Sequence, residues 1–439
     1  MNEREKIRSA IKEWQERENG EIKDRNVNFK LFEELDHIID ILGVRRSGKT
    51  YLMFMTIKKL EKEFGKDAII YINFENKILT PASDRLLDEA LLYFLERGYK
   101  KSFLFLDEIQ NVKNWERWAR TAYDSYKGKI KIIVSGSSSK IIRKDVASLL
   151  TGRHVSVKLF PLSFSEYIEF GNLQITKDDL LYSAKKQSIA KSMLDEYLRY
   201  GAFPEVCLEK NPQLKIELLR AYYDDILYRD VMEKHGIKEF AVMENFMKFL
   251  FYNISSYFSY KRGKEFLDSL GISTSTRTLL KYTSVLEEVF LFFFVPVFSG
   301  KARDHLRYPR KIYSIDAGLR NAVSPPSEDF GKIAENIVYL ELRRNHLNEI
   351  NYWKGRSEEV DFLVREGPKV RQIIQVCWDI SSKKTEQREI RGLVSCAKEL
   401  GLRKGLVITK DTEKEEKTDG VKISFIPLWK WLLSEKRGF

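Results

Sequence analysis

Cysteine and long apolar runs are both scarce in this chain of 439 residues. The three cysteines, Cys207, Cys377 and Cys396, are odd in number and widely spaced, which matches no metal-ligand pattern. Reduced thiols of this kind are typical of cytosolic proteins. The longest strongly apolar run, 289–298, is about half of what a bilayer span requires. No signal peptide is visible after Met1, so we expect a cytoplasmic protein without a membrane segment.

Positive charge, in contrast, is abundant. The chain has 76 Lys and Arg residues against 64 Asp and Glu residues, which gives a formal net charge of +12 at pH 7. This balance favours a polyanionic partner, and nucleic acid is the candidate, DNA ahead of RNA. A basic surface that binds nothing is an equal alternative. A hydrophobic content of 43% supplies ample core, and the length fits about three domains.

A glycine-containing segment follows the apolar run 38–42 and precedes a helical pattern over 51–64. Its spacing fits G-x4-G-K-[ST], the pattern of a phosphate-binding loop between a strand and a helix. Glycine is needed because the backbone takes unusual φ/ψ values close to the phosphates, and the amides of the following helix point at the anion. The predicted ATP-binding residues are Gly43, Val44, Arg45, Arg46, Ser47, Gly48, Lys49, Thr50 and Tyr51.

From Asp36 to about Phe170, strands alternate with helices, which predicts an α/β fold with a parallel sheet covered on both faces. The third strand, 102–106, is almost continuously apolar, as a strand buried on both faces should be. It delivers Asp107 and Glu108 at its carboxyl end, where open α/β sheets place their sites.

Four side chains are predicted to bring about ATP hydrolysis. Lys49 is expected to reach the β- and γ-phosphates, and Thr50 and Asp107 to hold Mg²⁺. Glu108 is placed to act as general base for the attacking water. The alternative, a solvated acidic loop, is disfavoured because a phosphate-binding loop lies upstream.

Three further polar residues are candidates with open alternatives. Ser135 and Ser137 follow the fourth apolar strand, where a hydroxyl can contact the γ-phosphate or the attacking water. Serines at strand ends are equally common as turn formers. Arg153 is a candidate nucleotide sensor in its own subunit or in a neighbour of a homo-oligomer, although a structural arginine is the more frequent outcome.

These motifs together carry a family resemblance. The chain resembles archaeal-type ATPases of the AAA-related class, in which an N-terminal ATPase module is fused to a C-terminal domain of unknown function. The resemblance implies an ATP-hydrolysing module and leaves the cellular task unassigned. The ordered segments that carry it are 43–50, 106–110, 150–153, 161–166, 200–205 and 228–230.

A second pattern occurs between 263 and 311, where a short helix, a turn with glycine, a longer helix, an apolar strand and a basic hairpin succeed one another. This order predicts a winged helix. If it binds DNA, phosphate contacts from its basic residues should depend strongly on salt. Packing or oligomer contacts are at least as probable a use for it. The candidate nucleic-acid contacts are Arg277, Lys281, Arg303 and Arg307, and Arg310 and Lys311 also belong to the predicted wing.

The last part of the chain resembles the restriction-endonuclease-like fold, whose metal motif is Asp followed by Glu-x-Lys on the next strand. Asp361 matches the aspartate and Glu335 an acid on the preceding helix. Gln375, however, stands where the second acid belongs, and Cys377 where the lysine belongs. A neutral amide is a poor ligand for Mg²⁺, so we expect this fold without nuclease activity.

The sequence thus predicts a helical extension over 1–35, a P-loop ATPase domain over 36–170, a helical and winged-helix domain over 171–300, and a restriction-endonuclease-like α/β domain over 301–439. The first hypothesis is an ATPase that couples hydrolysis to domain movement on nucleic acid. A slow nucleotide-dependent switch or scaffold is the second, and an ATP-dependent nuclease ranks third.

Overall fold

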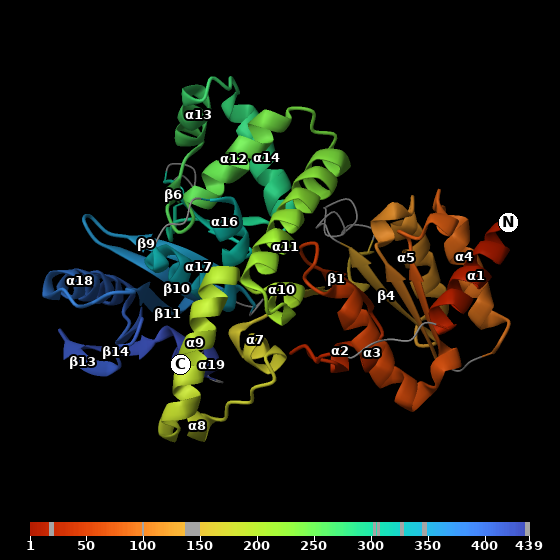
Figure 1. Cartoon of the computed structure of the whole chain (residues 1–439), viewed down its shortest axis with the longest axis horizontal. Helices are drawn as coiled ribbons and strands as arrows, with labels where there is room; N and C mark the ends of the chain where they lie inside the picture. The colour runs from red at the N-terminus through yellow and green to blue at the C-terminus, as the bar shows by residue number, and fades with distance from the viewer. Residues whose placement is uncertain are drawn as a thin grey trace. The chain divides into compact units, whose positions relative to one another are not determined.

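The computed structural model describes residues 1–16, 22–98, 101–136, 150–301, 304, 308–324, 329–344 and 349–434. The chain divides into two compact units. The first contains Met1–Phe160 and Glu288–Phe290, and the second contains Pro161–Glu287 and Leu291–Phe439. Figure 1 traces the elements of both units from red at the N-terminus to blue at the C-terminus.

A parallel sheet forms the centre of the first unit, with strand order β2-β3-β4-β1-β5. In chain order the elements are α1 (Glu3–Glu16), α2 (Lys30–Glu33), β1 (Ile38–Leu42), α3 (Lys49–Phe64), β2 (Ile69–Asn73), α4 (Asp84–Leu95), β3 (Ser102–Asp107), α5 (Trp115–Tyr126), β4 (Ile130–Gly136) and β5 (His154–Lys158). Because β4 lies between β1 and β3, the carboxyl ends of these strands lie side by side.

The strands of this sheet are apolar because both of its faces are covered. Every residue of β1, β3 and β4 is buried. The predicted parallel α/β fold is therefore confirmed. The N-terminal helix α1 buries Ile7, Ile11 and Trp14 in the first unit, and Trp14 belongs to the core cluster of the sheet. The helix predicted in the N-terminal extension therefore packs on this module.

The first half of the second unit is helical, as its periodicity predicted. Its elements are α7 (Phe164–Phe170), α8 (Lys177–Tyr182), α9 (Ala184–Tyr200), α10 (Pro204–Leu208), α11 (Pro212–Asp225), a π-helical segment (Ile226–Glu233) and α12 (Phe240–Tyr252).

Helix α9 is followed by Gly201, whose φ of 74° disfavours other residues. A Cβ at this position would lie 2.1 Å from Asp316 Oδ1. Asp316 is buried and accepts hydrogen bonds from the amides of Ala202 at 2.6 Å and Leu319 at 2.9 Å. The glycine is therefore required by a buried carboxylate that ties two distant segments together.

The elements from which the sequence predicted a winged helix follow in the expected order within the second unit. This region contains α12, β6 (Tyr257–Phe258), α13 (Tyr260–Ser269), α14 (Thr276–Glu288), β7 (Phe292–Val295) and β8 (Arg310–Ser314). The strands form an antiparallel sheet in the order β6-β8-β7. The predicted boundary at 300/301 falls inside the β7–β8 hairpin, so the hairpin spans two of the domains predicted from the sequence.

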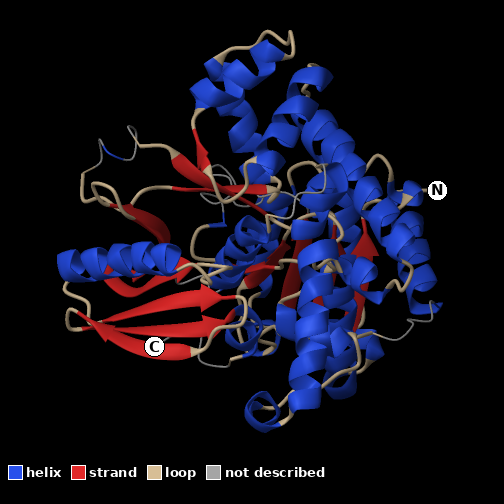
Figure 2. Cartoon of the chain, turned by 60° about the vertical axis from the view of Figure 1, so that its left-hand side comes forward, coloured by secondary structure: helices blue, strands red, loops and turns tan. Residues whose placement is uncertain are grey.

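The rest of the second unit is a mixed sheet with helices. After α16 (Ala317–Val323), its elements are α17 (Phe330–Arg344), β9 (Glu349–Lys354), β10 (Glu359–Glu366), β11 (Lys369–Val376), α18 (Lys383–Leu400), β12 (Lys404–Thr409), β13 (Lys414–Thr418), β14 (Val421–Pro427) and α19 (Leu428–Leu433). The strand order is β13-β14-β12-β11-β10-β9. Figure 2 shows α18 lying along this sheet, with which it shares a core cluster.

Candidate nucleotide site

The glycine-containing loop lies between the carboxyl end of β1 and the amino end of α3. Gly48 precedes the first residue of α3 with a φ of 95°. A Cβ at Gly43 would lie 2.2 Å from the carbonyl oxygen of Leu159, so the first glycine is needed for close backbone packing. The loop therefore has the unusual backbone conformation that the sequence pattern predicted. The close approach at Gly43 is to the backbone of Leu159, and an approach of the loop to phosphates stays a prediction.

The remaining loop residues divide by exposure. Val44 and Ser47 are buried, whereas Arg46 and Tyr51 are exposed, Tyr51 with 64% of its surface accessible. Arg45 lies between these extremes. The side chains of Arg46 and Tyr51 consequently point away from the core of the first unit.

Lys49 is almost completely buried, with 5% of its surface exposed. Its Nζ donates hydrogen bonds to the carbonyl oxygens of Gly43 and Val44, both at 3.1 Å. The ammonium group therefore lies against the backbone of the loop itself, at the carboxyl edge of the sheet.

Asp107, the last residue of β3, is fully buried and accepts hydrogen bonds from hydroxyl groups of three elements. Thr50 Oγ1 donates to Asp107 Oδ2 at 2.7 Å, and Tyr71 OH donates to the same oxygen at 2.8 Å. Ser135 Oγ donates to Asp107 Oδ1. Ser135 belongs to β4, the strand that separates β1 from β3. The hydroxyl of Thr50, after the loop, therefore contacts the carboxylate at the end of β3.

Glu108 leaves the strand with a φ of 53°, a left-handed conformation that is uncommon for a residue with a side chain. Its amide donates to Ser135 Oγ at 3.2 Å, and its Oε2 accepts a hydrogen bond from Gln110 Nε2. The residue is 9% exposed. The turn therefore directs the Glu108 carboxylate away from Asp107 and toward Gln110.

Ser135 lies inside β4 and is completely buried. Its hydroxyl contacts Asp107 and Glu108, so the turn-forming alternative for this serine is excluded. A contact with the γ-phosphate or the attacking water stays a prediction. Ser137 lies outside the described residues.

Arg153 does not reach this site within its own chain. It precedes β5, and the parallel register pairs His154 with Ile38, the first residue of β1. The loop follows Leu42 at the other end of β1, about 16 Å away for five strand residues. The Arg153 guanidinium instead pairs with Asp124, with Nε 2.7 Å from Oδ1. The prediction of a sensor within the same subunit is therefore corrected, and action on a neighbouring chain stays a prediction.

Arg25 is a site residue that the sequence reasoning missed. It is 7% exposed, and its Nη1 donates to the carbonyl oxygen of Ser47 at 2.9 Å. Its Nη2 donates to the carbonyl oxygen of Phe160, also at 2.9 Å. No motif identifies this arginine, because it lies in a polar joint far upstream of the loop. Tyr71 was missed because its contact with Asp107 depends on the pairing of β2 with β3. Gln110 was also missed, although its contact with Glu108 is local.

Replacing Arg25 with Met is expected to weaken ATP binding about tenfold, because the loop loses two charged hydrogen bonds to its supporting carbonyls. Titration of the protein with a fluorescent ATP analogue measures the affinity. Arg4→Met is the matched control, since Arg4 is exposed and pairs with Glu96 on the surface. A loss of thermal stability with unchanged affinity would show that Arg25 supports the fold and not the loop.

The winged helix presents basic side chains less uniformly than predicted. Arg277 and Lys281 are exposed on α14, while Arg303 and Arg307 lie outside the described residues. Lys311, expected on the wing, is 2% exposed. It lies on β8 and its ammonium points into the second unit, so its assignment to a nucleic-acid surface is corrected.

The acids of the C-terminal sheet surround this lysine. Lys311 Nζ lies 2.7 Å from Asp361 Oδ1, 2.7 Å from Glu359 Oε1 and 3.2 Å from Glu335 Oε1. Burial and the neighbouring Asp361 raise the pKa of Glu335 to about 8. Tyr313 OH donates to Glu335 Oε1 at 2.7 Å. The structure therefore brings Glu335 and Asp361 together, with an ammonium between them.

The two substituted motif positions lie beside this cluster. Gln375 Oε1 accepts a hydrogen bond from the amide of Asp361 at 3.0 Å. Cys377 is buried, which raises the pKa of its thiol to about 12, and its Sγ lies 3.4 Å from the carbonyl oxygen of Asp379. Within the described ranges, no group of three or more His, Cys, Asp or Glu side chains is arranged to hold a metal ion.

In the part of the chain that the structure describes, no helix combines the length and the apolar character needed to cross a bilayer.

Comparison with known proteins agrees with the geometry of the first unit. A family model described as an AAA domain matches residues 36–168. Two models described as domains of unknown function, DUF8612 and DUF4143, match residues 191–329 and 330–431. The predicted resemblance to AAA-related P-loop ATPases is confirmed for the N-terminal module.

Relatives cover almost the whole chain. An uncharacterized protein of Haemophilus influenzae is 26% identical over 405 residues, which are 91% of this chain and 95% of that protein. Among solved structures, the Walker-type ATPase PABY2304 of Pyrococcus abyssi is 12% identical, covers 73% of this chain and 94% of its own, and has a TM-score of 0.41. The uncharacterized protein MJ1544 of Methanocaldococcus jannaschii is 35% identical over 423 residues, 94% of this chain and 91% of that protein. This chain therefore belongs to the family of MJ1544, and its residues 36–168 form an AAA domain with a P-loop ATPase fold.

Proposed function

We propose that this chain binds ATP with Mg²⁺ and hydrolyses it at the carboxyl ends of β1 and β3. The proposal is carried by the hydrogen bond of 2.7 Å between Thr50 Oγ1 and Asp107 Oδ2. These two oxygens come from different elements, and hydroxyl and carboxylate oxygens are the hard ligands that Mg²⁺ accepts. The buried ammonium of Lys49 belongs to the same loop. The donor set therefore fits a metal-bound triphosphate.

The residues of the chain have separate roles in this reaction. Thr50 and Asp107 would hold Mg²⁺, which would supply positive charge to the bound triphosphate. Lys49 exchanges its carbonyl partners for phosphate oxygens, and the amides at the start of α3 point at the anion. Asp107 accepts the hydrogen bond of the Thr50 hydroxyl and so orients it. Glu108 exchanges Gln110 for the attacking water and accepts a proton from it.

The second part of the proposal is that nucleotide state is coupled to nucleic acid. Support comes from the exposed Arg277 and Lys281 on α14 and from the net charge of +12. Phosphate contacts release counterions, so binding through these residues should weaken steeply with salt.

ATP turnover by the full chain, with and without DNA and at two salt concentrations, tests both parts. We expect turnover that is lost in Lys49→Ala and that DNA stimulates more at low salt than at high salt. Absence of turnover that depends on Lys49 would overturn the proposal. Turnover that DNA never stimulates would restrict it to ATP hydrolysis alone.

A slow nucleotide-dependent switch is the second candidate, because Gln110 already engages the carboxylate of Glu108. In this case ATP would set the assembly state while hydrolysis stays slow. Light-scattering mass measurements with ATP, with ADP and without nucleotide separate the two candidates. A switch changes mass or shape at low turnover.

For the C-terminal part we propose a restriction-endonuclease-like module without nuclease activity. The order α17, β9, β10, β11, α18 and β12 supports the resemblance, since a helix and the strands after it bring Glu335 and Asp361 together. The buried ammonium of Lys311 lies between these acids, and Gln375 and Cys377 supply neither an acid nor a lysine. The nuclease hypothesis therefore ranks last.

A further inference from the structure

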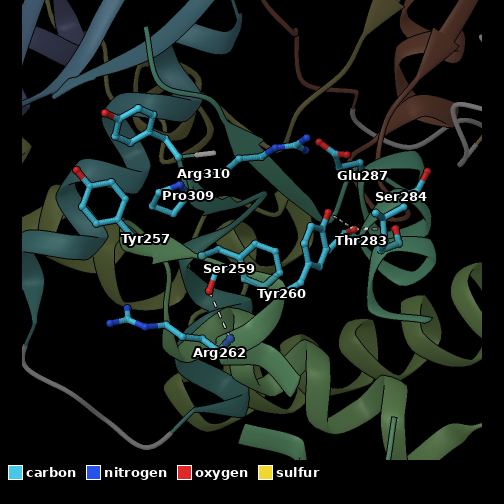
Figure 3. Close-up of a pocket in the computed structure, with 12 residues that line it drawn as sticks. Tyr257, Ser259, Tyr260, Arg262, Thr283, Ser284, Glu287, Pro309 and Arg310 are labelled. Atoms are coloured by element: carbon cyan, nitrogen blue, oxygen red, sulfur yellow. Dashed lines mark hydrogen bonds between the residues drawn. The ribbon is translucent and has the colours of Figure 1, made fainter. Parts of the chain in front are cut away.

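A pocket of about 650 Å³ lies at the base of the wing, within the second unit. Its walls come from the start of α13, one side of α14 and the start of β8 (Figure 3). The volume is within the range of small-molecule sites. Neither the nucleotide site nor the predicted contacts on α14 include its lining. The aromatic and charged lining residues include Tyr257, Tyr260, Arg262, Glu287, Tyr308 and Arg310.

Aromatic rings form part of this lining, and hydrogen bonds hold some of them in place. Tyr260 OH lies 3.2 Å from Thr283 Oγ1, which fixes the ring against α14. Tyr257 OH donates to Glu359 Oε2. Tyr308, at the rim, is 38% exposed. The rings are therefore presented to the pocket with little rotational freedom left to lose on binding.

Positive charge lies beside the rings. Arg262 and Arg310 line the pocket, and the positive charge of Arg310 acts on the carboxylate of Glu287. Arg262 belongs to the first turn of α13, whose N-cap Ser259 accepts a hydrogen bond from the Arg262 amide at 3.4 Å. A helix of this length adds partial positive charge at its amino end. Glu287, shown near Arg310 in Figure 3, adds a carboxylate acceptor to the lining.

These features together fit one chemical unit. A nucleotide has a flat aromatic base, which stacks on tyrosine and offers amino groups to a carboxylate, and a phosphate, which arginine binds. We propose that the pocket holds one unstacked nucleotide of a single-stranded nucleic acid, with its phosphate at Arg262 and its base against the tyrosines. This inference deepens the nucleic-acid part of the proposed function and rests on it.

A strand fits better than a free nucleotide because basic residues continue away from the pocket along α14. Leu280 and Ser284 line the pocket. Arg277 lies one turn before Leu280, and Lys281 one turn before Ser284, on the same exposed face. They are placed for the phosphates of neighbouring nucleotides. A paired base cannot enter such a pocket without leaving its stack, so duplex DNA should bind more weakly.

Fluorescence anisotropy tests the pocket with the full chain, saturating ADP to occupy the P-loop, and a labelled DNA oligonucleotide of about 12 nucleotides. We expect the single strand to bind more tightly than its duplex. Arg262→Glu should weaken single-strand binding about tenfold or more, because one phosphate contact is replaced by repulsion. Lys261→Glu is the matched control: it makes the same charge change on the adjacent residue, which is exposed and does not line the pocket.

Substitutions of Tyr308, at the rim of the pocket, test whether a base stacks on its ring. Tyr308→Leu should weaken single-strand binding about fivefold or more, and Tyr308→Phe should preserve it, because only the ring is needed. AMP, as a competitor, distinguishes a free nucleotide from a strand: the proposal expects the strand to bind much more tightly. The affinity for an RNA oligonucleotide of the same sequence shows whether the pocket distinguishes ribose from deoxyribose.

Equal losses in Arg262→Glu and Lys261→Glu would overturn the proposal, because they would show unspecific attraction to a basic surface. Equal affinity for the single strand and the duplex would overturn it as well. Turnover of ATP by the wild-type chain without oligonucleotide tests the nucleotide site separately. Failure of the pocket and failure of the proposed ATPase therefore give different results.

Discussion

Glu108→Gln is expected to lower the rate of ATP hydrolysis by about 10²–10⁴-fold, the usual contribution of a general base. The amide has the shape of the carboxylate but cannot accept the proton of the attacking water. Asp107, Thr50 and Lys49 keep their contacts, so ATP affinity should change little. Phosphate release measures the rate, and a fluorescent ATP analogue measures the affinity.

A control of equal charge change is Glu116→Gln at the start of α5, because Glu116 lies outside the site. Its turnover should match that of the wild type. If Glu108→Gln keeps the wild-type rate, another group accepts the proton and the assignment is wrong. If both rate and affinity fall, the substitution has disturbed the loop, and the contact of Glu108 with Ser135 becomes the first place to look.

Lys311→Met is expected to destabilise the second unit by about 3–5 kcal/mol, as removal of one partner from a buried ion cluster does. Three carboxylates lie within 3.2 Å of the lost ammonium, and the methionine side chain compensates none of them. Hydrogen exchange of the amides in β8 and β10 measures the free energy of local opening. Lys332→Met, which removes an exposed partner of Asp329, should cost no more than about 1 kcal/mol.

The loss should depend on pH. Burial beside Asp361 raises the pKa of Glu335 to about 8 in the folded chain, above that of an unfolded glutamate. The folded state therefore binds this proton more tightly. The resulting stability is fully present below the unfolded value, near pH 4, and is lost as pH rises through about 8.

Without Lys311, no ammonium offsets the negative charge of the carboxylates, so protonating them stabilises the folded state more. Lys311→Met should therefore be less destabilising near pH 5 than near pH 8. An equal loss at both values would show that the effect comes from side-chain packing and not from charge. A loss as small as that of Lys332→Met would show that the cluster contributes little, and the argument against a metal site at these acids would weaken.

The nucleotide site was predictable because its residues occur at fixed, short spacings along the chain. Two glycines at a fixed distance, a Lys-Thr pair after the second, and two acids after a buried strand can be recognised without a fold. The parallel sheet followed from near-continuous apolar strands alternating with helices. The same reasoning anticipated the order of elements in the winged helix.

This reasoning could not identify residues whose role depends on contact between distant segments. Arg25 reaches the loop across more than twenty positions of chain, and Tyr71 reaches Asp107 because β2 pairs with β3. Arg153 was a candidate nucleotide sensor, with a structural arginine as the more frequent outcome, and the parallel register places it at the opposite edge of the sheet. Spacing along the chain contains no information about which edge a residue reaches.

The sequence by itself determined the glycine spacing of the loop, the two acids that follow a buried strand, and the order of helices and strands between 263 and 311, because each is a local pattern of side chains and backbone freedom. Tertiary structure alone decided that β4 separates the loop strand from the acidic strand, that Thr50 meets Asp107, and that Lys311 turns inward to three carboxylates. Strand order and burial arise from pairing and packing between segments far apart in the chain. For that reason they could be found only in the folded molecule.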